Sequence, residues 1–359
     1  MPPFFRPNCL PVLIGSLPLE DHHQALRLVL RHTPEIPVWA QLPAHPQEGM
    51  MAQFLPGLPG LKMVGERQLV DTADGGFDAG LVAFYEAYLA VSEGAGDLDG
   101  SRFALTPATA GGFFALLQAL KDLQPPPAAL KGQVTGPFTL TTGVSDQDKR
   151  AIFYNPQVRD AAVKLLALKA RWQVRRLGAA GCPVIIFIDE PALAGFGTSE
   201  FISVSKDDVA ACLEEVIAAI HAEGGLAGVH VCANTDWSVV LNSEADIVNF
   251  DAYAYFEKFI LYPDRIKAFI ARGGILAWGI VPTLRTEDIE RETADALADR
   301  WQTQARQVAA LGIAPEAIQA QSLISPSCGV GALSLVHATR VLELTRAVSL
   351  KLRATPIDR

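Results

Sequence analysis

Long hydrophobic runs are absent from this 359-residue sequence. No stretch of about 18 uninterrupted apolar residues occurs, so no membrane-spanning helix is expected. Runs of lysine and arginine are absent too, and the formal net charge is −9. An acidic chain without a basic cluster is poorly suited to bind nucleic acid or an anionic membrane. The sequence therefore predicts a soluble protein whose main partner is a small molecule.

Cysteine is scarce, and its pattern excludes a disulfide framework. The chain has an odd, scattered set of five, namely Cys9, Cys182, Cys212, Cys232 and Cys328. The chain also opens without the charged segment, apolar core and cleavage site of a secretory signal. We therefore expect a protein of the reducing cytoplasm, in which Cys9, Cys182 and Cys212 are ordinary small hydrophobes or surface thiols.

Apolar residues, by contrast, make up 50% of the chain, which is enough for one large hydrophobic core. Short apolar runs that end in glycine, proline or polar residues predict eight strands covered on both faces, at 11–18, 37–43, 130–137, 183–191, 227–234, 246–253, 274–282 and 318–329. Helical patterns lie between them, at 20–32, 155–181, 206–225, 256–274 and 285–312. This alternation predicts an α/β fold, a (β/α)₈ TIM barrel formed by a single domain over 1–359. An open, doubly wound sheet is the alternative, because alternation alone does not show closure.

One connection is too long for a simple barrel. The segment 44–129, between the second and third predicted strands, contains a hairpin pattern around 62–80 and helical patterns at 79–92 and 107–123. We interpret 44–129 as an insertion that caps the barrel.

The residues that suggest chemistry stand at the carboxyl ends of the predicted strands. His230 and Cys232 are two residues apart on one strand, so their side chains face the same way. Asp251 ends the next strand and Cys328 follows the last one, and barrel active sites form at this face. An imidazole, two thiols and a carboxylate suit Zn²⁺ better than Mg²⁺ or Ca²⁺. We therefore predict a zinc site.

Each of these residues also has a simpler interpretation. A histidine beside a cysteine in a strand is often part of the core, and an aspartate at a strand end often caps the next turn. Cys328 weighs against this interpretation, because it lies in the polar, glycine-containing loop "SPSCGVG", where a structural cysteine has little reason to be.

Over nearly its whole length the chain resembles the C-terminal catalytic barrel of cobalamin-independent methionine synthase. The motifs "IGSLP" (14–18), "TGP" (135–137) and "IDEPAL" (188–193) occur in the family's order. They are followed by "HVC" (230–232), a carboxylate about twenty residues later and "SCG" (327–329), which resemble the family's zinc-binding residues.

The resemblance implies a role for each matching residue. His230, Cys232 and Cys328 would be zinc ligands, with Asp251 at the position where the family has glutamate. Ile14, Gly15 and Ser16 would hold the carboxylate of homocysteine. Asp189, with Glu190 beside it in the same motif, would hold the ammonium group. Zinc would remove the proton from the homocysteine thiol, which then takes the methyl group in an in-line displacement to form methionine.

The methyl donor is where the chain departs from the long members of the family. Those enzymes have a further N-terminal barrel, which is expected to be missing here, and a tryptophan after T-G-P on which the pterin of the folate rests. The corresponding stretch here, "FTLTTGVSD" (138–146), has no tryptophan. Their H-G-E acid has no clear counterpart either, and Gln41, Gln47 and Glu48 are the candidates. We therefore expect a methylated corrinoid protein as the donor, as in the short members of the family, in place of methyltetrahydrofolate.

Three other functions compete with this prediction. Related barrels use a similar His/Cys set to transfer methyl groups from a corrinoid protein to coenzyme M. Uroporphyrinogen decarboxylase, another relative, needs no metal and should lack the cysteine ligands. A non-catalytic zinc-binding barrel would have a saturated site closed to added thiol.

Overall fold

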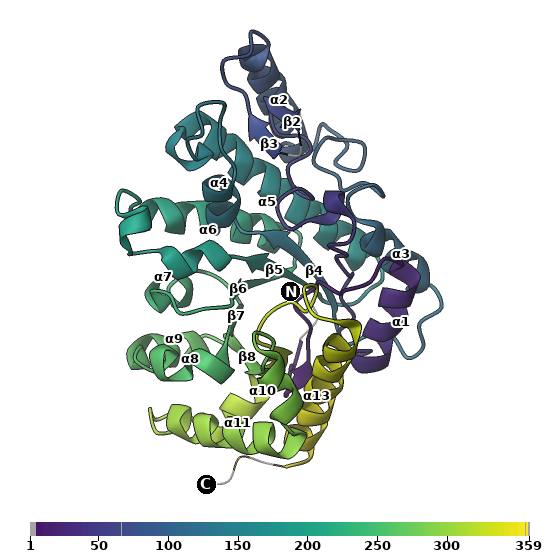
Figure 1. Cartoon of the computed structure of the whole chain (residues 1–359), viewed down its shortest axis with the longest axis vertical. Coiled ribbons are helices and arrows are strands. Elements are labelled where there is room, and N and C mark those ends of the chain that lie inside the picture. The colour runs from purple at the N-terminus through teal and green to yellow at the C-terminus, as the bar shows by residue number, and fades with distance from the viewer. Residues whose placement is uncertain (1–4, 66, 356, 358–359) are drawn as a thin grey trace.

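The computed structural model describes residues 5–65, 67–355 and 357. A parallel sheet of seven strands, in the order β1-β9-β8-β7-β6-β5-β4, forms its centre. The strands are β1 (Leu10–Pro11), β4 (Leu130–Thr135), β5 (Val184–Asp189), β6 (Leu226–Val231), β7 (Ile247–Phe250), β8 (Ile275–Val281) and β9 (Ser322–Pro326). The sheet curls, and helices surround it (Figure 1). The predicted α/β class with parallel strands is confirmed.

The segment 37–41 lies between the two edges of this sheet. Lys131 of β4 donates its backbone N–H to Pro37 O at 3.0 Å, and Gln41 donates to Gly15 O, just beyond β1, at 3.1 Å. Residues 37–43 were predicted as a full strand, but they form only isolated bridges. Pro37 and Pro43 provide no N–H at either end of the segment, so a regular ladder cannot extend through it. The bridges nevertheless join both sheet edges, as a barrel requires and an open sheet does not.

Helices pack around the outside of the strands. The α-helices are α1 (His22–His32), α2 (Phe77–Ser92), α3 (Gly111–Ala119), α4 (Pro137–Gly143), α5 (Pro156–Gly178), α6 (Lys206–Ala222), α7 (Trp237–Leu241), α8 (Ala252–Phe259), α9 (Pro263–Ala271), α10 (Thr286–Arg291), α11 (Ala294–Ala309), α12 (Pro315–Ala320) and α13 (Leu335–Ala354). Short 3₁₀ helices are η1 (Pro46–Glu48), η2 (Ile152–Tyr154), η3 (Pro191–Gly195) and η4 (Ser199–Phe201). Among the described residues, no helix combines the length and the apolar character needed to cross a bilayer.

Two predicted helices are each divided in the structure. The pattern at 256–274 forms α8 and α9, because Pro263 cannot donate a helical hydrogen bond and instead starts the second helix. The pattern at 285–312 forms α10 and α11, because Thr293 turns extended and caps α11 by accepting from Ala296 N at 3.2 Å. The long helix α13 had no counterpart in the sequence-based prediction.

The segment 44–129 contains the predicted hairpin and helices. Strands β2 (Leu61–Val64) and β3 (Arg67–Val70) pair antiparallel, while Glu66 at their turn lies outside the described residues. The hairpin and α2 project at one end of the molecule (Figure 1). That 44–129 serves as a cap stays a prediction.

The barrel interior is a separate apolar cluster, formed by side chains that alternate inward along the strands. Its buried members are Leu10, Val12, Ile14, Ile36, Ala129, Ile185, Phe187, Ile247, Ile275, Ala277 and Leu323. This cluster fills the lower part of the barrel.

Candidate functional site

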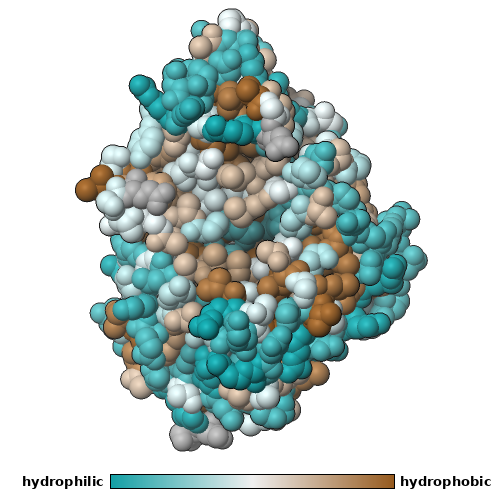
Figure 2. Space-filling model, viewed as in Figure 1, coloured by the Kyte–Doolittle hydropathy of each residue, from teal (hydrophilic) through white to brown (hydrophobic). Residues whose placement is uncertain are grey.

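A cavity of about 470 Å³ opens at the carboxyl ends of the strands. The face drawn in Figure 2 is hollowed near its centre, with hydrophobic residues beside the hollow. Six residues predicted from the sequence line the cavity, namely Ile14, Ser16, Asp189, His230, Cys232 and Cys328. Residues from β1, β5, β6 and β9 and the loops that follow them therefore meet in one place, although they are up to about 300 positions apart in the chain.

The imidazole of His230 and the thiols of Cys232 and Cys328 form a compact cluster. One ligand atom from each residue lies within 4.8 Å of the other two. His230 is 3% exposed and the two cysteines are half-buried. Burial on one side and the cavity on the other leave room for an ion and for one further ligand.

Asn249 on β7 fixes the orientation of the His230 ring. Its Nδ2 donates to Ala277 O and to Ser325 Oγ, each at 2.8 Å, which turns its Oδ1 towards His230 Nδ1. Because Oδ1 can only accept, Nδ1 carries a proton, and Nε2 is the ring nitrogen left for a metal. A histidine held in this way is prepared to bind a metal through Nε2. Sequence analysis missed Asn249, although an asparagine inside an otherwise apolar strand was a signal for it.

The two cysteine thiols interact with one another. A hydrogen bond from Cys328 lowers the pKa of Cys232 and raises that of Cys328, and the hydrogen bond from His230 acts on Cys232 in the same direction. Cys232 is therefore the more acidic of the two thiols.

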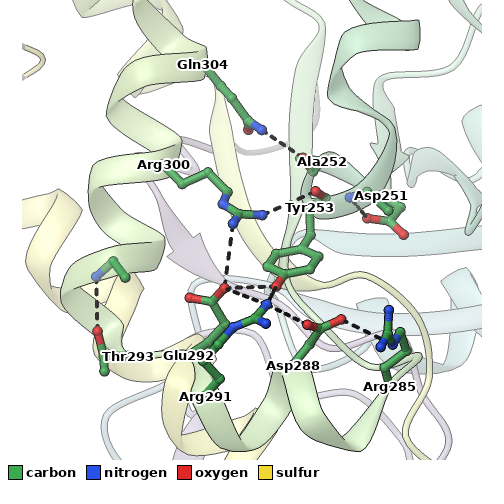
Figure 3. A network of polar contacts seen from close by, with 12 residues as sticks. Asp251, Ala252, Tyr253, Arg285, Asp288, Arg291, Glu292, Thr293, Arg300 and Gln304 are labelled. Carbon is green, nitrogen blue, oxygen red and sulfur yellow. Dashed lines mark hydrogen bonds and ion pairs between the residues drawn. The ribbon is translucent and has the colours of Figure 1, made fainter.

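Asp251 does not belong to this cluster. It stands at the N-terminus of α8, where its Oδ1 accepts from Ala254 N at 2.8 Å (Figure 3). Burial raises the pKa of Asp251 to about 6. Asp251 therefore caps a helix, as the simpler interpretation of the sequence expected. Its role as fourth zinc ligand stays a prediction.

Asp189 at the end of β5 has an unpaired carboxylate oxygen. The residue is 7% exposed and lines the cavity, and its Oδ1 has no hydrogen-bond partner among the described residues. Burial raises the pKa of Asp189, while His230 and Lys131 oppose the shift. A buried carboxylate oxygen without a donor is costly, and a cationic group in the cavity would satisfy it.

Glu190, the next residue, directs its carboxylate to the start of α4. Its carboxylate accepts from the backbone N–H of Phe138 at 2.9 Å and of Thr139 at 2.8 Å, at the start of α4. Gly136 makes this contact possible, because a Cβ there would lie 2.0 Å from the carboxyl carbon of Glu190. Glu190 is not among the residues that line the cavity, and its role in substrate binding stays a prediction. The T-G-P and I-D-E motifs are thus joined by a structural contact.

The backbone of Ile14, Gly15 and Ser16 is held through its carbonyl oxygens. Ile14 O accepts from Lys131 Nζ at 2.5 Å, Gly15 O from Gln41 N at 3.1 Å, and Ser16 O from Val330 N at 3.2 Å. None of the three amide N–H groups makes a backbone–backbone hydrogen bond among the described residues. Successive N–H groups alternate in direction along an extended backbone, so those of Ile14 and Ser16, which line the cavity, are the candidates to donate to an anionic ligand.

The segment 44–129 contributes one carboxylate to the cavity. Glu48 lines it and is held by Leu42 N at 3.0 Å, Gly111 N at 2.9 Å and His22 Nε2 at 2.7 Å. Of the three candidates for the family's acid, Gln41 and Glu48 line the cavity, whereas Gln47 does not.

The donor set decides which metal fits the cluster. Two thiols and one imidazole suit Zn²⁺, and three protein ligands with an open position are typical of catalytic zinc. The described residues therefore fit zinc, with Asn249 as the group that orients the imidazole.

Comparisons with known proteins give a family match and a similar fold. The family model described as the catalytic domain of cobalamin-independent synthase matches residues 118–349. No curated protein matches the chain. Among solved structures, the chain is similar to a B12-independent methionine synthase from Shewanella sp. W3-18-1 in complex with selenomethionine, with 19% identity and a TM-score of 0.54. The match covers 96% of this chain and 98% of the other and, at this identity, shows a shared fold.

Proposed function

The chain belongs to the cobalamin-independent synthase family, and from this premise we propose that it transfers a methyl group to the thiol of homocysteine and so forms methionine. One observation supports this proposal above the others. A His/Cys/Cys cluster, an unpaired carboxylate and the backbone of Ile14 and Ser16 all lie at one cavity. A thiol-bearing amino acid is the ligand that needs all three.

Each part of homocysteine has a matching group. Asp189 would accept the ammonium group, with Glu48 as the second carboxylate of the cavity. The amides of residues 14–16 would hold the carboxylate. Zn²⁺ at His230, Cys232 and Cys328 would deprotonate the incoming thiol and hold it as the nucleophile. Asp251 is then the candidate for a fourth, weakly held ligand.

The protein residues contribute mainly by positioning. Three anchor points, at the thiol, the ammonium and the carboxylate, leave homocysteine little freedom to turn. Alignment of sulfur, methyl carbon and leaving group supplies much of the rate of such a displacement. Asn249 holds the ring of His230, and Gln304 donates to Ala252 O just after β7. These bonds keep the strand ends in place.

We propose a methylated corrinoid protein as the methyl donor. The residues known to line the cavity include no phenylalanine, tyrosine or tryptophan on which a pterin could stack, and no lysine or arginine to pair with the carboxylates of a folate. Base–aromatic stacking is worth roughly 1 to 3 kcal/mol, so its loss weakens folate binding considerably. A corrinoid carries its methyl group at the surface of its carrier and needs only an open cavity mouth.

The alternative acceptor, coenzyme M, is less suited to this cavity. It has a sulfonate and no ammonium group, and both Asp189 and Glu48 would repel it. A non-catalytic zinc site is also less suited, because the cluster faces a cavity large enough for a small ligand.

The decisive experiment compares donors and acceptors on the zinc-loaded protein. Methionine formation from homocysteine is measured with methylcobalamin and with methyltetrahydrofolate side by side, and coenzyme M replaces homocysteine in a parallel assay. We expect methionine with methylcobalamin and little or none with the folate. Robust turnover with the folate would overturn the donor assignment, and turnover with coenzyme M alone would overturn the acceptor.

A further inference from the structure

A lysine lies inside the barrel, directly beneath the cavity. Lys131 on β4 is 0% exposed, and its Nζ stands 4.2 Å from the centroid of the Phe187 ring, within the apolar interior. Burying a charged group in this way is unfavourable unless partners compensate for the lost water. Partners that stabilise the buried ammonium group of Lys131 are therefore expected.

The partners of Lys131 connect it to both ends of the proposed amino-acid site. Its Nζ donates to Ile14 O at 2.5 Å and lies 3.5 Å from Gln133 Oε1. Lys131 also interacts electrostatically with Asp189, which lies further along the β4–β5 ladder. A carbonyl oxygen, an amide oxygen, an aromatic face and a carboxylate all favour a cation.

The bond to Ile14 O determines how the next amide points. In a trans peptide the C=O of one residue and the N–H of the next point in opposite directions. Lys131 holds Ile14 O towards the barrel interior, so the N–H of Gly15 is directed away from Lys131 and is left without an acceptor among the described residues. Ile14 lines the cavity, so the lysine fixes the backbone at the cavity edge and adds a positive charge beneath it.

We infer that Lys131 is a positioning residue for the carboxylate of the amino-acid substrate, acting through the Ile14–Gly15 peptide and through its own charge. This inference rests on the proposed function, because it names the residue that prepares the carboxylate end of the same site. Asp189 and Lys131 then act on opposite ends of the substrate, because the aspartate selects the ammonium group and the lysine favours the carboxylate.

The test uses thiols that lack one charged end of homocysteine. Calorimetry on the zinc-loaded full chain measures the affinities of homocysteine, of 4-mercaptobutanoate, which lacks the ammonium group, and of 3-aminopropane-1-thiol, which lacks the carboxylate. We expect Lys131→Met to weaken homocysteine and 4-mercaptobutanoate by about tenfold or more, the range of a lost charge-assisted interaction. The affinity of the aminothiol should change clearly less, because Lys131 acts on that thiol only through its interaction with Asp189. Lys131→Gln keeps a hydrogen-bond donor but no charge. It should weaken the same two carboxylate-bearing thiols, by a smaller factor.

A second buried lysine provides the matched control. Lys169 on α5 is 1% exposed and does not line the cavity, so Lys169→Met removes a buried ammonium without touching the site. It should leave all three affinities unchanged. Equal weakening of the three thiols by Lys131→Met, or unchanged homocysteine binding, would overturn the inference. Failure of the wild-type protein to bind any of the thiols would overturn the proposed function and, with it, this inference.

Discussion

Two buried polar clusters meet at the turn between β7 and α8, and they differ in how completely their groups are paired. Behind the turn, Glu292 accepts from Tyr253 Oη at 2.8 Å and pairs with Arg300 at 3.5 Å, and Arg300 lies over the Tyr253 ring (Figure 3). In front of it, Asp189 Oδ1 has no partner in the described chain and the cysteine thiols have mainly each other.

The difference indicates what each cluster is for. A network whose charges are matched within the chain gains nothing from a ligand and serves to hold its elements together. A cluster whose buried groups are left open becomes satisfied only when a ligand or metal enters. Gln304 donates to Ala252 O at 2.8 Å, so the helix that carries Arg300 is also bonded to the turn that carries Asp251.

The largest effect is expected from removing one thiol of the open cluster. Cys328→Ser should reduce zinc from about one ion per chain to a small fraction and lower methyl transfer by a factor on the order of 100 or more, because a hydroxyl is a poor zinc ligand at neutral pH. Metal analysis and the methylcobalamin assay measure both.

Cys182→Ser is the matched control, since Cys182 lies outside the cluster and should keep its zinc. Full zinc occupancy and activity in Cys328→Ser would show that the cluster is not the metal site.

The adjacent acids Asp189 and Glu190 offer a sharper comparison. Asp189→Asn should weaken homocysteine binding by roughly 1.5 to 3 kcal/mol, because it removes a charge-assisted bond to the ammonium group, while zinc content stays unchanged. Titration calorimetry on the zinc-loaded protein measures this loss.

Glu190→Gln should do the opposite. It weakens the acceptor at the start of α4, so the melting temperature should fall while homocysteine affinity is retained. If Asp189→Asn binds homocysteine as tightly as the wild type, Asp189 has no part in the site.

Breaking the paired network should affect stability first. Glu292 is 6% exposed, but the Arg300 side chain is 38% exposed and stays in contact with water, so Glu292→Gln should lower the free energy of unfolding by about 1 kcal/mol. Zinc content should remain near that of the wild type. Denaturant unfolding measures the change, and Asp295→Asn, at an exposed ion pair, is the control with almost no expected effect. An unchanged unfolding energy in Glu292→Gln would mean that the network does not hold the turn.

The smallest effect concerns pH and lies far from both clusters. Asp246 accepts a hydrogen bond from His221 at 2.8 Å and raises the pKa of this histidine, against the effect of burial. A raised pKa means that the stabilisation is complete below the unfolded value of about 6.5 and is lost as pH rises through the folded value. Because both side chains are about one-third exposed, we expect only a few tenths of a kcal/mol.

His221→Gln should therefore reduce the difference in stability between about pH 6 and pH 8. A variant that keeps the whole difference would assign it to other groups.

Local patterns in the sequence predicted most of the helices and strands and the three members of the His/Cys/Cys cluster. Apolar runs such as Val184–Asp189 can only be strands buried on both faces, and the i, i+2 spacing of His230 and Cys232 follows from strand geometry alone. Cys328 could be added because parallel strands end at one face of a barrel, which places residues distant in sequence side by side.

Only the tertiary structure decided how the remaining polar groups are used. Asp189 and Glu190 are neighbours in sequence, yet one faces the cavity and the other accepts the amides of α4. Asp251 caps α8 through Oδ1, a contact that its position in the sequence allowed but did not establish. Lys131 lies in a strand that the sequence marks as buried, but its partners Ile14 O and Phe187 come from other parts of the barrel. Whether a buried polar group is paired or left open depends on donors and acceptors distant in sequence, and no local pattern contains them.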